Sequence, residues 1–138
     1  MQIISVINQK GGVGKTTTVI NLAAGLTQLN KKILVIDLDP QGNATTGFGL
    51  SNIDNSSDTI YGVLNGTKEI KEVIKKTQFE NLDIITSNVD LSGLEVETAD
   101  DSNRAFILKA KLTPYLNNSR GLYDYVLIDC PRGQSIST

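Results

Sequence analysis

The chain has 138 residues and a formal net charge of −2, so the molecule as a whole is not a basic clamp for nucleic acid. Its 39% of hydrophobic residues is typical of one globular domain or of part of a larger one. The sequence has no histidine and one cysteine, which excludes an internal disulfide, the common zinc sites and histidine-based acid–base chemistry.

Short apolar runs and helical patterns alternate from the first residues onward. The run at residues 3–7 is rich in β-branched side chains and predicts a buried strand. It is too short for a signal peptide or a membrane span, so we expect a cytoplasmic protein with no membrane contact. Apolar residues at helical spacing predict a core-facing helix over 17–29 that stops at Asn30, and residues 33–36 predict a second strand.

The same alternation continues to the last apolar run. Residues 59–64 and 68–76 are expected to form two short helices separated by a turn, and residues 82–85 a third strand. A longer helix follows from Asp101 or Ser102 towards Leu116, with Pro114 bending or ending its last turn. Residues 125–128 predict a fourth strand. This order predicts an α/β fold with a mostly parallel sheet and flanking helices.

A glycine-rich segment joins the first strand to the first helix. Such a loop turns backbone N–H groups towards an anion, and the helix that it enters favours bound phosphate. The lysine of its Gly-Lys-Thr core supplies a positive charge for the β- and γ-phosphates, and the threonine hydroxyl can ligate Mg²⁺. A plain glycine-rich turn is the alternative. The segment predicts a nucleotide-phosphate site made of Lys10, Gly11, Gly12, Val13, Gly14, Lys15, Thr16 and Thr17.

Three aspartates lie at the carboxyl ends of predicted strands, where α/β sheets build ligand sites. Asp37 and Asp39 are two residues apart and so point to one face of an extended segment, although solvated turn residues would look the same. Asp129 ends an apolar strand, where a carboxylate without a partner would be costly. Mg²⁺ is one natural partner for Asp129, and an N-cap of a following turn is the other.

These motifs together resemble a known family. Residues 9–17 are similar to the deviant Walker A motif of the ParA-type (Soj/ParA) partition ATPases, and Lys10 matches the signature lysine of that motif. Residues 37–47 resemble the second motif of that family, and residues 123–131 resemble its Walker B strand. Residues 87–93 add a fourth match in the same order. The resemblance therefore covers nearly the whole chain and implies a P-loop NTPase fold.

The resemblance also implies a mechanism and partners. It implies ATP hydrolysis in which Lys15 and Lys10 contact phosphates, Lys10 reaching across a homodimer, and Asp39 activates the attacking water while Asp37 supports it. It implies Mg²⁺ held by Thr16, Asp39 and Asp129, partly through water. The implied partners are non-specific DNA and a ParB-type centromere-binding protein. Residues 41–46 would form a switch-like loop that senses the γ-phosphate.

The sequence departs from the family after Pro131, and the family domain is nearly twice as long. We therefore expect residues 1–138 to be the N-terminal half of that domain, in one unit, without the N-terminal helix-turn-helix of larger plasmid versions. A truncated, catalytically silent remnant is one alternative. A septum-positioning ATPase of the MinD type is another, although its second motif differs from the Asp-Pro-Gln-Gly-Asn that begins at Asp39. Iron-protein relatives need cluster cysteines, which residues 39–129 lack.

Overall fold

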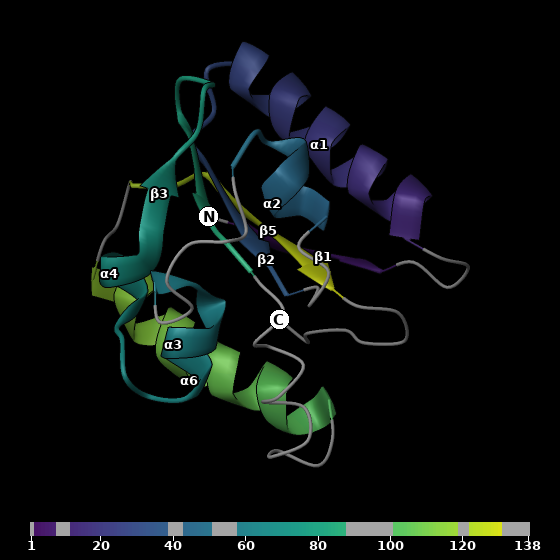
Figure 1. The fold of residues 1–138 in the computed structure, drawn as a ribbon. Helices are drawn as coiled ribbons and strands as arrows, with labels where there is room; N and C mark the ends of the chain where they lie inside the picture. The colour runs from purple at the N-terminus through teal and green to yellow at the C-terminus, as the bar shows by residue number, and fades with distance from the viewer. Residues whose placement is uncertain are drawn as a thin grey trace.

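The computed structural model describes residues 2–7, 12–38, 43–50, 58–87, 101–118 and 122–130. Strands and helices are interspersed along this part of the chain, with three short helices in succession between the second and third strands (Figure 1). In chain order they are β1 (Gln2–Ile7), α1 (Gly12–Gln28), β2 (Ile33–Asp37), α2 (Asn43–Gly47), α3 (Ile60–Leu64), α4 (Ile70–Val73), β3 (Ile74–Lys76), β4 (Leu82–Ile85), α6 (Asp101–Asn118) and β5 (Tyr125–Cys130).

The described strands form one sheet in the order β1-β5-β2-β4-β3. Strand β5 pairs in parallel with both β1 and β2, and β2 pairs in parallel with β4. Only the short edge strand β3 runs antiparallel among the described strands. The predicted mostly parallel sheet is therefore confirmed, and β1 lies at the opposite edge of the described sheet.

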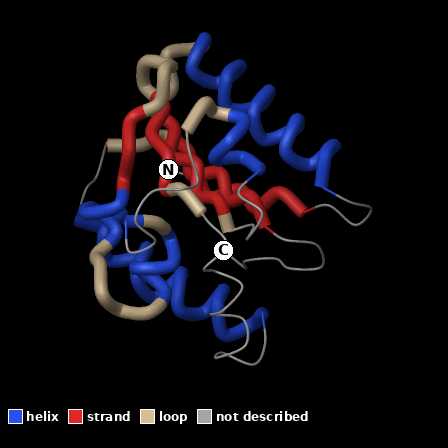
Figure 2. Tube along the Cα trace, in the orientation of Figure 1, coloured by secondary structure: helices blue, strands red, loops and turns tan. Residues whose placement is uncertain are grey.

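Helices cover both faces of the sheet and give a three-layer arrangement (Figures 1 and 2). Alternate side chains of β2 separate the two cores, since side chains of a strand point to opposite faces in turn. Ile33 and Val35 pack with Val19 of α1 and Phe48, beside α2. Leu34 and Ile36 pack instead with side chains of α3, α4 and α6, chiefly Ile60, Val63, Ile70, Val73, Leu108 and Leu112.

Helix α1 begins five residues before the predicted start at Thr17, so the glycine-rich segment runs into its first turns. Residues 16–20 are all β-branched, a composition that lowers helix propensity. Val19 and Ala23 are fully buried against the sheet, and this packing outweighs the weak propensity. Asn30 has a φ of 61°, which fits its predicted role as the stop.

The prediction of a second short helix over 68–76 is wrong in its second half. Helix α4 ends at Val73, and residues 74–76 pair with β4 as β3. Lys75 and Lys76, which the sequence analysis would place on a helix, therefore lie on a strand. The Lys75 ammonium group bonds to the Thr86 hydroxyl (2.9 Å) and to the Asp58 carbonyl, so pairing and these bonds decide the conformation.

Helix α6 continues for four residues beyond Pro114, so the proline does not end it. Leu108, Leu112 and Leu116 on this helix are buried in the same core as α3 and α4. A proline within a helix removes one backbone donor, and the buried leucines on both sides of it offset this loss.

At the amino end of the sheet, Tyr123 holds β4 against the residues that precede β5. Its hydroxyl donates to Asp83 Oδ2 at 2.7 Å, and the side chain is largely buried. Burial raises the pKa of the Tyr123 hydroxyl above its ordinary value, and the hydrogen bond to Asp83 raises it further. The tyrosine therefore stays protonated in the folded state at pH values where it ionises in the unfolded chain.

A Tyr123→Phe variant is expected to be less stable by about 1 to 2 kcal/mol at pH 7, because it loses a hydrogen bond to a carboxylate. Since the folded-state pKa is raised, the wild-type advantage is complete below about pH 10 and shrinks as the pH rises further. Urea unfolding at pH 7 and above pH 10 checks both statements. Tyr61→Phe is the matched control, and an equal loss in the control would contradict the assignment.

Candidate functional site

Two buried aspartates lie side by side at the carboxyl edge of the sheet. Asp37 is the last residue of β2, and the strand register places it directly opposite Asp129 of β5. Both residues are fully buried. Strand alternation puts both on the face that carries α1 and α2, because Val35 and Leu127, two residues earlier on each strand, pack there. The structure therefore brings together two of the three predicted strand-end aspartates.

Only the second part of the predicted phosphate loop lies within the described residues. Residues 8–11, and with them Lys10 and Gly11, lie outside the described residues, as does Asp39. The backbone of Gly12 to Thr17 forms the first turns of α1, which follows β1, the neighbour of β5. The first four N–H groups of a helix have no acceptor within it, so the start of α1 suits an anion.

A hydrogen-bond chain fixes Asp37 to two other parts of the molecule. The backbone N–H and the hydroxyl of Thr45 both donate to Asp37 Oδ2, at 2.9 Å and 2.7 Å. The Ser87 N–H donates to the Thr45 hydroxyl oxygen at 3.0 Å. Asp37, Thr45 and Ser87 are all fully buried. This arrangement fits the supporting role that the resemblance implies for Asp37.

The residue before Asp39 is also held at this edge. The N–H of Leu38 donates to the carbonyl oxygen of Asp129 at 3.0 Å, which continues the pairing of β2 and β5 beyond Asp37. Helix α2 follows Asp39 after a few residues and carries Thr45. Leu38 before residues 39–42 and α2 after them are therefore both hydrogen-bonded to residues at the carboxyl ends of strands.

The donor set at this edge fits magnesium. Mg²⁺ prefers oxygen ligands and is bound by one or two carboxylates together with phosphate oxygens and water. The structure supplies the buried Asp129 carboxylate on the face of the sheet that α1 covers. Among the described residues, no group of three or more acidic, histidine or cysteine side chains forms a complete protein cage for a metal ion.

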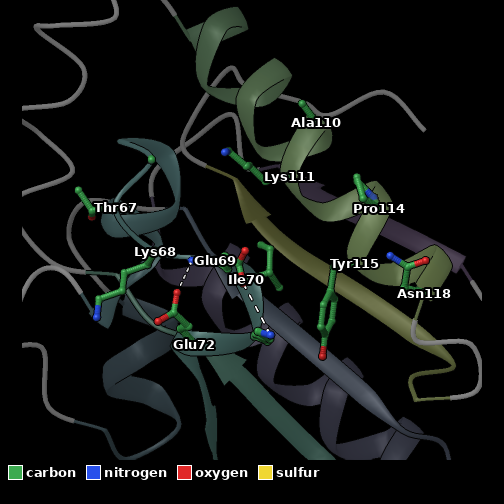
Figure 3. Close-up of a pocket in the computed structure, with 12 residues that line it drawn as sticks. Thr67, Lys68, Glu69, Ile70, Glu72, Ala110, Lys111, Pro114, Tyr115 and Asn118 are labelled. Carbon is green, nitrogen blue, oxygen red and sulfur yellow. Dashed lines mark hydrogen bonds and ion pairs between the residues drawn. The ribbon is translucent and has the colours of Figure 1, made fainter.

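A hollow lies on the other face of the sheet, between α4 and α6 (Figure 3). It has a volume of about 710 Å³ and mixes lysines with glutamates. Glu69 and Glu72 close the capping box of α4, with the Glu69 N–H donating to Glu72 Oε1 at 2.9 Å. Lys71 lies 3.8 Å from the Glu69 carboxylate. These charges are engaged in local structure, and the hollow is separate from the aspartate edge.

Comparison with known proteins identifies the family of this chain. The family model described as an AAA domain, AAA_31, matches residues 1–138. The chain belongs to this AAA_31 family. Within it, the chain is 42% identical over 137 residues to the sporulation initiation inhibitor protein Soj of Bacillus subtilis. That match covers 99% of this chain and 52% of Soj, so the chain spans about half the length of the curated relatives that it matches. The resemblance to Soj/ParA proteins is confirmed.

Solved structures agree with the AAA_31 assignment. Cobyrinic acid a,c-diamide synthase from Mycobacterium smegmatis, with a bound ATP analogue and magnesium, has a TM-score of 0.81 and 36% identity over 95% of this chain and 51% of its own. The septum site-determining protein MinD from Pyrococcus horikoshii, with Mg-ADP, has a TM-score of 0.69 and 32% identity over 99% of this chain and 51% of its own. The predicted P-loop ATPase fold is therefore confirmed.

Thr45 and Ser87 contribute to the site although the sequence analysis assigns them no role of their own. Each falls within a segment that matches a family motif, and that position was the only available signal. Thr45 and Ser87 are 42 residues apart in the chain, so only the folded structure reveals their contact.

None of the described helices combines the length and apolar character that a membrane crossing requires.

Proposed function

We propose that this protein binds and hydrolyses ATP with Mg²⁺ and acts in DNA partition. The observation that carries the proposal is the pair of buried aspartates, Asp37 and Asp129, on the sheet face that α1 covers in a chain 42% identical to Soj. The bound ATP analogue and magnesium in the M. smegmatis relative support the same ligands here. Buried carboxylates beside a helix start are the parts that nucleotide hydrolysis by a P-loop needs.

Each predicted site residue has a defined task in this proposal. Gly11 to Thr17 surround the phosphates with backbone N–H groups, and Lys15 neutralises the β- and γ-phosphates. Thr16 and Asp129 hold Mg²⁺, with water completing its shell. Asp39 orients the attacking water and contributes to the metal shell. Lys10 contacts the ATP of a second copy of the chain.

The proposed setting of this activity is a cytoplasmic dimer on DNA. ATP binding would join two copies, and the dimer would hold DNA through its phosphates without reading its sequence. A ParB-type centromere-binding protein would stimulate hydrolysis and release the DNA. These partners are proposed for a protein of the relatives' full length, because the relatives are about twice as long as this chain. The likeness to MinD makes septum positioning the second candidate.

A thermal melt with and without MgATP tests the nucleotide site. A ligand that binds only the folded state raises the melting temperature. At a ligand concentration of about 100 times its Kd, the free energy of unfolding increases by roughly 2.7 kcal/mol. We expect MgATP to raise the melting temperature of the wild-type chain and to leave that of Lys15→Ala unchanged. Lys31→Ala, which alters an exposed lysine after α1, is the matched control and is expected to respond like wild type.

The outcomes separate the alternatives. An equal shift in wild type and Lys15→Ala would contradict the assignment of the phosphate site. A shift without release of phosphate from ATP would favour the silent remnant over the ATPase. Phosphate release that stops in Lys15→Ala would exclude the remnant.

A further inference from the structure

One buried hydroxyl, that of Thr45, joins three parts of the chain. It donates to Asp37 Oδ2 at 2.7 Å and accepts the Ser87 N–H at 3.0 Å. The Thr45 N–H donates to the same carboxylate oxygen at 2.9 Å. Thr45 thus links α2 to the end of β2 and to the residues that follow β4.

The chemistry of this link restricts the residue at position 45. The side chain must donate one hydrogen bond and accept another, and serine and threonine do both with a single atom. The acceptor is a carboxylate, which gives shorter and stronger hydrogen bonds than a neutral acceptor. All three residues are fully buried, so bulk water does not replace a lost bond.

The position of the link relates it to the chemistry. Asp37 lies in register opposite Asp129, and Leu38 donates from its N–H to the Asp129 carbonyl at 3.0 Å. Thr45 therefore restrains both the Asp37 carboxylate and α2 at the edge where the nucleotide is proposed to bind. Misplacement of a catalytic arrangement by about 1 Å costs roughly 100-fold in rate.

We propose that Thr45 is a positioning residue for ATP hydrolysis, acting through Asp37 and the start of α2. It holds them in the arrangement that hydrolysis requires, and through Ser87 it ties this arrangement to the carboxyl end of β4. This inference rests on the proposed ATPase function. Thr45 contacts neither nucleotide nor metal in this scheme, so it affects turnover more than binding.

The test compares Thr45→Val with Thr45→Ser in the full 138-residue chain. Valine keeps the shape and removes the hydroxyl, whereas serine keeps the hydroxyl and removes only a methyl group. We expect Thr45→Val to lower kcat for MgATP about tenfold or more, with KM and the Kd for MgADP within about twofold of wild type. Thr45→Ser is expected to stay within about threefold of wild type in all three constants.

Other results would overturn the inference. They are a kcat of Thr45→Val like that of wild type, an equal loss in Thr45→Ser, or a loss of MgADP binding that matches the loss of kcat. The last result would mean that the hydroxyl serves only the structure. If Thr45→Val does not melt cooperatively, Thr45→Cys takes its place, because a thiol is a weak donor and acceptor. A kcat of Thr45→Cys equal to that of Thr45→Ser would then overturn the inference.

The failure of this inference is distinguishable from the failure of the proposed function. A wild-type chain that binds MgATP without turnover, or that binds no nucleotide, would contradict the ATPase and with it any role of Thr45 in hydrolysis. A wild-type chain that hydrolyses MgATP while Thr45→Val keeps the same kcat would overturn the inference alone.

Discussion

Asp129→Asn is expected to remove most of the magnesium dependence of ATP binding. Asp129 is fully buried at the carboxyl end of β5, in register with Asp37 and next to β1, which precedes α1. Asparagine keeps the volume and the backbone bond to Leu38 but removes the negative charge that holds Mg²⁺. We expect about 10- to 100-fold weaker binding of MgATP, the size of effect seen when groups around a metal are altered. Titration with ATP in the presence of Mg²⁺ or of a chelator measures it.

The same strand supplies a control for this prediction. Asp124 precedes β5 at the other end of the sheet, where its exposed carboxylate accepts the Lys32 N–H at 2.8 Å. Asp124→Asn makes the same chemical change about one strand length away, and it is expected to keep the magnesium response. If Asp129→Asn keeps the wild-type ratio of affinities with and without Mg²⁺, Asp129 does not serve the metal.

Leu127→Ala is expected to have the largest effect on folding. Leu127 is fully buried on β5, an interior strand between β1 and β2, in the core that includes Val19 of α1 and Phe48. Removing a buried leucine side chain costs about 2 to 5 kcal/mol, because apolar contacts are lost and a cavity remains. Domains of this kind have a free energy of unfolding of roughly 5 to 15 kcal/mol, so the change is a large part of the total. Urea unfolding at 25 °C measures the difference.

Leu29→Ala is the matched control, because it deletes the same atoms where the side chain is 67% exposed. We expect a change within about 0.5 kcal/mol for this surface position. Similar losses in the two variants would show that Leu127 does not occupy a tightly packed core. A loss confined to Leu127→Ala would support the buried position of Leu127 on β5.

Local pattern was enough to predict most elements, because the signals lie within each element. Residues 33–36 are a continuous apolar run and residues 82–85 are apolar except for Asp83, and the structure buries these apolar side chains between two layers of helices. The prediction failed at residues 74–76 because apolar residues at 70, 73 and 74 also fit a helix. Pairing of Ile74 with Ile85 decided in favour of a strand, and the sequence gives no local sign of that contact.

The site could be predicted only in part for a similar reason. Asp37 and Asp129 were predictable, since each is a charged residue at the end of an apolar strand. Their direct opposition depends on β5 lying beside β2, and strand order depends on contacts between distant parts of the chain. The role of Thr45 depends in addition on Ser87, which approaches it only after β4 has joined the sheet.

The insertion of β5 between β1 and β2 has a consequence for synthesis. Strands β1 and β2 leave the ribosome long before the strand that must separate them, so no neighbour of β1 in the described sheet exists until residues 125–130 have been made. Until then the nascent chain carries an apolar strand with open hydrogen-bonding edges, a state that favours aggregation and chaperone binding. Closing the sheet requires contacts between residues more than 100 positions apart, which slows folding. The described sheet is thus completed late, when the strand between β1 and β2 arrives.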